Sequence, residues 1–315
     1  MNVTELLERT RDILRERVGT SNASLNWQDD ELLRCLNAAN DLMWKKARQA
    51  DENWGLATAL LSELSAVATQ VGERYYNVRF PRHLGTVKYM EEIRSDSGIT
   101  TEIPMLNIRQ TRYFHNTPLL TDLSPRGWWP GANESEIFVT NQPRGLDLTA
   151  IRVWFLRRTP RLLRFTSSVY AATNQLTTDR GQATLGTLEG EDGLYDGAVI
   201  EHISGGAQLV VTIGNHFYVT DFSVSGSLSL VFTLNPEHGI GSGTSTWEVI
   251  PTWPEEHHEL LALVAARRAL LSGSSVDDRI SIEREMAQEW EAFINNIEDR
   301  HYQAAHMVSW EDPEP

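Results

Sequence analysis

Near both ends of the chain, apolar residues recur every three to four positions, which is the spacing of an amphipathic helix. One stripe combines Leu32, Leu36, Ala39, Met43 and Ala47. The helices that this pattern predicts run from Thr4 to Val18, from a cap at Asn26 onward, from about Asn53 to Val71, through Leu260–Leu271, and from about Val276 to His301.

In the middle of the chain the spacing changes to two, which is typical of strands. Gly-rich turns such as Gly205-Gly206 separate the apolar segments, and no helical spacing intervenes. This pattern predicts an antiparallel sandwich or barrel. The predicted strands are 74–80, 86–93, 136–140, 148–157, 161–170, 183–188, 197–203, 208–213, 216–224 and 228–234.

Together these patterns predict an α+β fold. A helical bundle formed by the N-terminal and C-terminal helices carries an inserted antiparallel β-sandwich or barrel domain. The expected parts are residues 1–72 and 254–301 for the bundle, 73–253 for the β domain, and 302–315 for an extended acidic tail.

Composition excludes several classes of protein. With 41% hydrophobic residues and 10 Trp, the 315-residue chain has ample core material. Its longest apolar stretch, Leu260–Ala266, is far shorter than the roughly 18 residues of a membrane span, so no membrane partner is expected. The single Cys35 excludes a disulfide framework. A net charge of −15 argues against a dedicated nucleic-acid binder.

The basic residues are unequal, with 25 Arg against three Lys. Arg and Trp enrichment with few Lys is typical of protein–protein interfaces. A GC-rich genome, which favours Arg codons, is the alternative explanation, and the sequence leaves both open.

The candidate catalytic and metal-binding residues do not match the motifs that such chemistry requires. His257-His258-Glu259 lacks the later His of a zinc protease motif, because Ala262 stands there. The Gly-rich run at 239–243 lies between strand candidates without a helix to hold phosphate. The acidic group Glu189, Glu191 and Asp192 falls in a solvated turn, so a glycan hydrolase has little support. We therefore expect no enzyme activity, cofactor or metal site.

Two groups of residues are candidates for partner contact. Trp128 and Trp129 form an aromatic loop, which either binds a partner or plugs its own domain. A basic island in this acidic chain comprises Arg152, Arg157, Arg158, Arg161 and Arg164. These arginines either contact an acidic partner or DNA phosphates, or pair with local carboxylates on a solvated strand.

Four stretches, in order along the chain, resemble the head-to-tail adaptor (connector) proteins of tailed bacteriophages. They are an opening helix with the pattern W-x-D-x-E-L-L-x-x-L-N-x-A at 27–39, the strand pair IRVWFLRRTPRL at 151–162, YDGAVI at 195–200, and the return helix WPEEHHELLALVAA at 253–266.

The resemblance implies a virion structural protein at the head–tail junction, present in host cytoplasm during assembly. It implies a ring of twelve copies beneath the portal protein, which contacts the tail tube, nozzle or tail-fibre proteins and passes viral double-stranded DNA non-specifically through its lumen. In the manner of the family, residues 301–315 are expected to leave the bundle and dock on the portal. The expected docking residues are Tyr302, Met307, Trp310, Glu311 and Asp312. The alternative is a carbohydrate-binding or tail-fibre-docking β module that the helices oligomerise.

Overall fold

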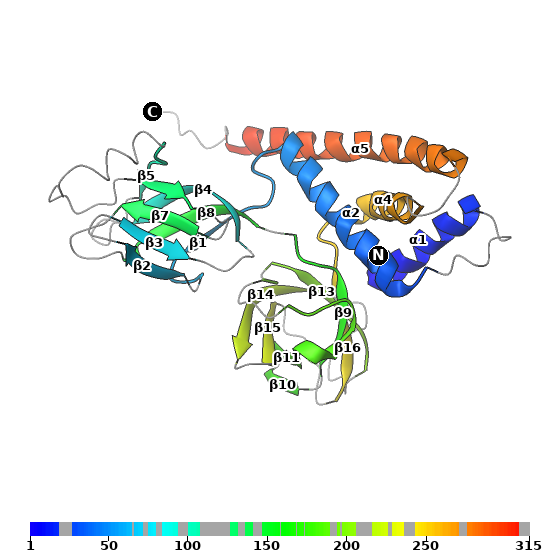
Figure 1. Cartoon of the computed structure of the whole chain (residues 1–315), viewed down its shortest axis with the longest axis horizontal. Helices are drawn as coiled ribbons and strands as arrows, with labels where there is room; N and C mark the ends of the chain where they lie inside the picture. The colour runs from blue at the N-terminus through cyan, green and yellow to red at the C-terminus, as the bar shows by residue number, and fades with distance from the viewer. Residues whose placement is uncertain are drawn as a thin grey trace. The chain divides into compact units, whose positions relative to one another are not determined.

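The computed structural model shows an α+β protein with antiparallel sheets, divided into two compact units (Figure 1). Unit 1 comprises residues 1–54, 159–190 and 195–315, and unit 2 comprises residues 55–158 and 191–194. The residues that the structure describes are 1–18, 27–64, 66–71, 75–79, 84–93, 100–107, 127–131, 136–140, 147–157, 159–167, 169–172, 174–189, 194–195, 197–205, 216–225, 229–235, 243–270 and 276–308.

The helices of unit 1 come from both chain ends and share one apolar cluster. Helix α4 is buried nearly all round, as its continuous apolar sequence predicts. Helix α2 buries the predicted stripe and begins one residue after an N-cap at Gln28; the predicted cap Asn26 lies outside the described residues. The helices are α1 (Val3–Val18), α2 (Asp29–Ala50), α4 (His258–Leu270) and α5 (Val276–Val308), with 3₁₀ turns η1 (Arg180–Gln182) and η2 (Glu255–His257).

Unit 1 also contains an eight-stranded antiparallel sheet in the order β10-β11-β15-β14-β13-β16-β9-β12. The sheet curls on itself, because Ser167 Oγ on β9 donates to the carbonyl of Thr177 on β11 over 2.8 Å. Phe165, Phe232 and Trp247 fill its interior. Its strands are β9 (Leu163–Ser167), β10 (Val169–Ala172), β11 (Gln175–Asp179), β12 (Ala183–Leu185), β13 (Val199–Gly205), β14 (His216–Ser225), β15 (Ser229–Asn235) and β16 (Ser245–Ile250).

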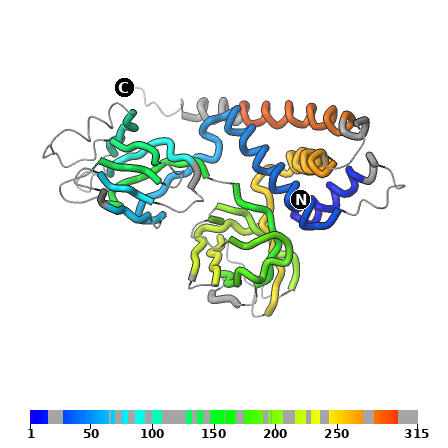
Figure 2. Tube along the Cα trace, in the orientation of Figure 1, coloured from blue at the N-terminus to red at the C-terminus, as the bar shows by residue number. Residues whose placement is uncertain are grey.

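Strands distant in sequence are neighbours in this sheet. The green trace of β9 runs beside the yellow-orange trace of β16, with Phe165 opposite Trp247 (Figure 2). Strand β16 leads through Trp253 into α4, so the return of the chain to the helices starts from the middle of the sheet.

Unit 2 consists of two four-stranded antiparallel sheets, ordered β1-β8-β4-β5 and β2-β3-β7-β6. Residues from both sheets, among them Val78, Met90, Trp128 and Val153, form one apolar cluster. The strands are β1 (Leu56–Leu60), β2 (Val67–Val71), β3 (Tyr75–Arg79), β4 (Leu84–Ile93), β5 (Thr100–Ile103), β6 (Trp128–Pro130), β7 (Glu136–Thr140) and β8 (Ile151–Arg157).

The predicted helix over 53–71 is wrong, because this segment contains strands β1 and β2. Gly55 takes a positive φ of 76° and its carbonyl accepts a hydrogen bond from the Arg157 amide. Leu56–Leu60 then pairs residue by residue with β8. Leu and Ala favour helices only weakly, so pairing with a strand almost a hundred residues away decides the conformation.

The β segment also differs from the single inserted domain predicted over 73–253. Its strands are divided between the two units, and the strands of unit 2 begin at Leu56 rather than after residue 72. Strands β5, β6 and β11 were not predicted, β10 only overlaps the end of the predicted strand 161–170, and the strand expected after residue 243, which is β16, was given no bounds. The predicted strand 208–213 lies outside the described residues. The last helix continues to Val308, so residues 302–308 are helical instead of an extended tail.

Candidate interaction surfaces and the buried polar network

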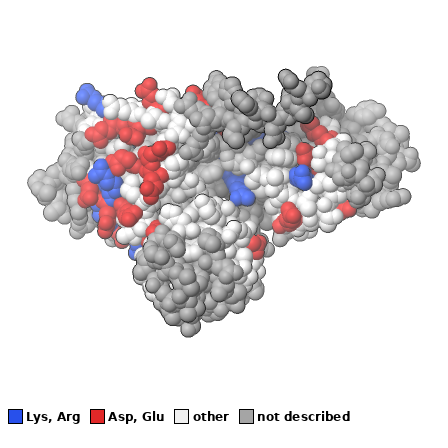
Figure 3. Space-filling model, turned by 180° about the vertical axis from the view of Figure 1, so that it is seen from behind, with Lys and Arg blue, Asp and Glu red and all other residues white. Residues whose placement is uncertain are grey.

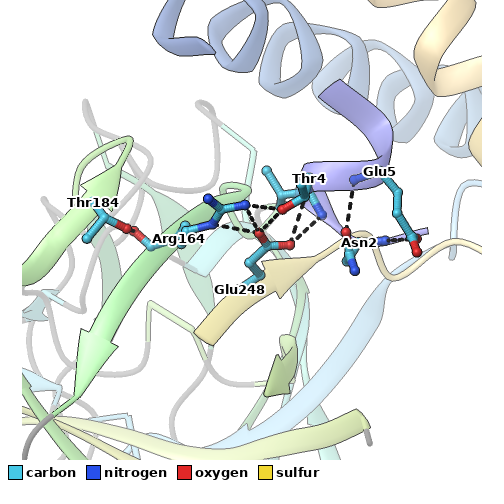
Figure 4. Close-up of polar contacts among 7 residues, drawn as sticks. Asn2, Thr4, Glu5, Arg164, Thr184 and Glu248 are labelled. Atoms are coloured by element: carbon cyan, nitrogen blue, oxygen red, sulfur yellow. Dashed lines mark hydrogen bonds and ion pairs between the residues drawn. The ribbon is translucent and has the colours of Figure 1, made fainter. Parts of the chain in front are cut away.

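The side chain of Glu248 is completely buried, and it holds the first turn of α1 against the sheet. One carboxylate oxygen, Oε2, accepts hydrogen bonds from the backbone amides of Val3 at 2.7 Å and Thr4 at 3.3 Å. The other, Oε1, accepts from the Thr4 hydroxyl at 2.6 Å (Figure 4). The first amides of a helix lack partners within it and attract negative charge, so Glu248 supplies from another element what a capping side chain supplies locally.

Strand register places the counter-charge. Arg164 on β9 lies directly opposite Glu248 on β16, and its Nε and Nη2 donate to Oε1 at 2.7 and 2.5 Å. Arg164 also donates to the hydroxyl of Thr4 (Figure 4). The side chains of Trp247 and Val249 point into the interior of the curled sheet. Side chains alternate along a strand, so Glu248 lies on the outer face of the sheet, beneath the start of α1. A carboxylate this closely covered positions a helix and leaves no space for a substrate.

A second carboxylate lies on the neighbouring strand, because Glu201 on β13 is directly opposite Glu248 on β16. Burial raises the pKa of Glu201; His216 lowers it, while Glu5 and Glu248 raise it further. Glu201 is half-buried, in contrast to Glu248. Glu248 therefore has cationic and amide partners, whereas Glu201 carries a cost for its charge.

The chain start is held from two directions. Asn2 and Glu5 exchange hydrogen bonds at 2.9 Å, the Asn2 side chain accepting from the Glu5 amide and the Glu5 carboxylate from the Asn2 amide. The ammonium of Met1 lies 2.8 Å from Nδ1 of His258, whose Nε2 lies 2.9 Å from the carbonyl of Trp253. Burial, followed by the nearby ammonium, lowers the pKa of His258. The neutral ring with Nε2–H donating and Nδ1 accepting satisfies both contacts.

Polar side chains of α2 form further links to the rest of unit 1. Asn37 donates to the carbonyl of Leu162 at 3.0 Å and accepts from its amide at 2.7 Å. Asn40 accepts from the indole N–H of Trp253 at 2.7 Å. Trp253 also stacks on Trp54, with ring centroids 5.8 Å apart. The contacts of Asn37 and Asn40 fix the rotation of α2, because each joins one face of the helix to a particular backbone group or ring.

Acidic side chains gather on the helical part of unit 1, with few basic ones among them (Figure 3, left). Arg9 on α1 forms a two-pronged ion pair with Glu259 on α4, whose Arg267 in turn pairs with Glu283 on α5 at 2.8 Å. Glu255 is 83% exposed, and its carboxylate lies 3.7 Å from the Met1 ammonium. The face of the helical part in this view is therefore mainly acidic, and ion pairs join α1 to α4 and α4 to α5.

The predicted aromatic contact residues have different environments. Trp128 is 1% exposed and belongs to the core of unit 2, as the plug interpretation predicted. Trp129 points to the opposite face of the sheet, where its ring stacks on Phe138 at 5.5 Å and meets the edge of Tyr75 at 5.5 Å. Only Trp129 of the two is thus partly accessible, and alternation along β6 explains the difference.

The basic island is divided between the units and largely paired. Arg157 is half-buried in unit 2, while Arg158 lies outside the described residues. Arg161 is 69% exposed and lies 3.5 Å from Glu189 in unit 1. Arg152 contacts Glu91 at 3.7 Å. For Arg152 and Arg161 the alternative of pairing with local carboxylates is confirmed.

The remaining chemical candidates have structural roles where they are described. His257 packs edge-on against Phe293 at 5.0 Å, and Glu259 is occupied by Arg9. Burial raises the pKa of Cys35, which makes the thiol a poorer nucleophile. Glu191 and Asp192 lie outside the described residues. Among the described residues, no group of His, Cys, Asp and Glu is arranged to hold a metal ion.

Tyr302 and Met307 of the predicted docking tail lie on the last turns of α5, and the structure does not describe their side chains. Trp310, Glu311 and Asp312 lie beyond the described residues. No described helix has the length and apolar character that crossing a membrane requires. No protein-family model and no curated protein matches the chain.

The sequence interpretation missed Glu248, because the strand expected after residue 243 was given no bounds and its residues were not considered. A signal was present: a single carboxylate interrupts the apolar run Trp247–Ile250. Buried charges require a partner, so such an interruption indicates either an exposed face or a specific counter-charge. Only the register with Arg164 distinguishes these two cases.

Proposed function

We propose that the chain is a head-to-tail adaptor of a tailed bacteriophage, a virion structural protein that forms a ring beneath the portal and connects the capsid to the tail. In this proposal the four helices of the described chain act as the bundle of the adaptor, and the antiparallel strands form the insertion between its two halves. The proposal rests on the ordered sequence resemblance and on one structural observation, the length of α5.

Helix α5 extends well past the helix that it packs against. Asn296 on α5 donates to Glu256, in the turn immediately before α4, at 2.7 Å. The remaining residues to Val308 therefore continue beyond the start of α4, by about 18 Å at 1.5 Å per residue. Such an arm suits a protein that carries its C-terminal segment to a partner, and the predicted docking residues Tyr302 to Asp312 lie on it or just after it.

Charge supports the same function. Each chain carries −15, so a ring of twelve carries −180. Where part of this charge lines the lumen, it repels DNA phosphates and keeps the duplex from adhering during passage. Cohesion of the ring then depends on contacts between subunits.

The test is attachment to the portal. Deleting residues 302–315 should leave a folded chain that no longer co-sediments with purified portal rings, and Trp310→Ala should weaken attachment in the same direction, because aromatic anchors dominate such interfaces. Met105→Ala, which alters a 62%-exposed side chain of unit 2, serves as the control and should attach normally. Attachment of the truncated chain at the wild-type level contradicts the docking role.

One observation favours the alternative of a carbohydrate-binding or tail-fibre-docking module. Tyr75, Trp129 and Phe138 form a group of rings on the outer face of the β2-β3-β7-β6 sheet, each within 5.6 Å of the other two. Binding of the full chain to a glycan array, lost in Trp129→Ala, would favour this function. Trp128 is unsuitable for that test because its substitution removes core packing.

A further inference from the structure

Two of the three lysines in the chain are adjacent, Lys45 and Lys46, near the C-terminal end of α2. Both are exposed, and neither pairs with a carboxylate of the described chain. Many of the arginines behave differently. Those of unit 1 with a carboxylate partner are Arg9, Arg11, Arg161, Arg164 and Arg267. Within the described part of this strongly acidic chain, the lysine pair is thus a local positive charge without a counter-charge.

Helix α5 presents a complementary surface. Its inner stripe buries Ile282, Phe293 and Ile297. The outward stripe repeats at intervals of four and three, and every member is exposed: Arg284, Gln288, Glu291, Asn295 and Glu298. Glu291 and Glu298 form no ion pair with described residues. They lie seven residues apart, about 10 Å along the helix, which leaves two separate carboxylates facing outward.

We propose that Lys45 and Lys46 of one copy contact Glu291 and Glu298 of the next copy in the ring. This inference rests on the proposed function, because it names the surfaces through which that ring closes. A ring joins two different surfaces of the same chain, head to tail, so it requires a pair of patches that are complementary to each other. The basic end of α2 and the outward stripe of α5 are such a pair.

The apolar neighbours of these charges add contact area. Leu42 lies one turn before Lys45 and Lys46, and Ile294 lies between the two glutamates; both are half-buried against the helical core. An exposed ion pair by itself contributes little to the free energy of association. The charges therefore set the orientation and partner choice of the contact, while apolar area supplies much of its cohesion.

The proposal is tested with charge reversals on the full-length chain, with assembly followed by mass photometry over a range of concentrations. Lys45→Glu/Lys46→Glu makes both surfaces acidic, and Glu291→Lys/Glu298→Lys makes both basic. Each variant alone should require a concentration higher by about tenfold or more to assemble. An equal mixture of the two should assemble again, since each interface then joins opposite charges. The fourfold variant, which exchanges the signs on one chain, should also assemble.

A control variant carries the same change in charge elsewhere. Arg79→Glu/Lys88→Glu alters two basic residues of unit 2 and should assemble as the wild type does. Raising the salt concentration should weaken wild-type assembly and reduce the difference between the variants.

The outcomes separate this inference from the proposed function. Wild-type assembly that both reversals leave unchanged contradicts this interface and leaves the ring intact. The same conclusion follows if Lys45→Glu/Lys46→Glu changes only the binding of duplex DNA, which would place the lysines against phosphate. Failure of both the mixture and the fourfold variant to recover also contradicts the pairing. A wild-type chain that stays monomeric at every concentration contradicts the self-assembled ring itself.

Discussion

The two units of this protein use different means to hold their layers together. In unit 1, helices meet a curled sheet, and the junction contains a buried carboxylate, a guanidinium and the amides of a helix start. In unit 2, two sheets share an apolar cluster that contains Met90, Trp128 and Val153. The helix–sheet junction of unit 1 thus depends on directional polar contacts, and the junction between the two sheets of unit 2 depends on buried apolar area and complementary shape.

The difference follows from what each junction must satisfy. The start of a helix brings amides without partners, and burying them requires an acceptor. The strands of unit 2 pair within their sheets, so the faces that meet present only side chains. A polar junction specifies one arrangement, because any other leaves charges unpaired, whereas an apolar junction tolerates modest rearrangement.

The largest expected effect is in unit 1. Glu248→Ala leaves Arg164 and the first amides of α1 without their acceptor, and we expect the free energy of unfolding of unit 1 to fall by about 3–5 kcal/mol. Chemical denaturation followed by circular dichroism measures it. Glu8→Ala removes an exposed carboxylate from the same helix and should change stability by less than about 0.5 kcal/mol. Equal effects of the two substitutions would show that the buried network adds no stability.

In unit 2, the two neighbouring tryptophans separate core packing from surface stacking. Trp128→Ala removes a fully buried ring and should destabilise unit 2 by about 3–5 kcal/mol. Trp129→Ala loses mainly its contacts with Phe138 and Tyr75, so about 1 kcal/mol is expected. Thermal unfolding by calorimetry resolves both. The reverse order of effects would mean that the outer face, not the inner one, holds unit 2 together.

The smallest expected effect has the opposite sign and depends on pH. Because burial raises the pKa of Glu201, the folded chain binds its proton more tightly than the unfolded chain does. The contribution of this group to stability is present below its ordinary pKa of 4.5 and is lost as pH rises through the folded pKa. Glu201→Gln should therefore stabilise unit 1 at pH 7, by less than about 1 kcal/mol because the group is half exposed.

The gain from Glu201→Gln should vanish below pH 4.5, which denaturation curves at pH 4 and pH 7 would reveal. Glu248→Gln provides the matched control. It neutralises the carboxylate on the opposing strand, which has a guanidinium and helix amides as partners, and it should destabilise at pH 7. A stabilising Glu248→Gln would contradict the contrast between the two carboxylates.

The spacing of apolar residues was sufficient to predict those helices and strands that bury one face against the rest of the protein. The stripe Leu32 to Ala47 and the all-round apolar run of α4 were predicted, and both are buried. Most strands of the middle segment were also predicted, because alternation reflects a half-buried sheet. The segment 53–71 was not, since its Leu and Ala residues suit a helix. Its strand conformation depends on pairing of β1 with the distant strand β8 and of β2 with β3, the next strand along the chain.

The roles of the candidate contact residues also depend on tertiary structure that local sequence does not reveal. Trp128 and Trp129 are adjacent and similar in sequence, and only the face of β6 on which each lies makes one a core residue and the other an accessible ring. The predicted docking residues Trp310, Glu311 and Asp312 lie outside the described residues and stay a prediction.

By itself, the sequence determined the helices near the chain ends, the class of the fold and the acidic balance, because periodicity and charge are properties of neighbouring residues. Only the tertiary structure decided that the strands form two separate units, that Leu56–Leu60 is extended, and that Glu248 is buried under α1. Strand partners and counter-charges come from residues far along the chain, and the free energy of those contacts exceeds the weak preference of any local segment.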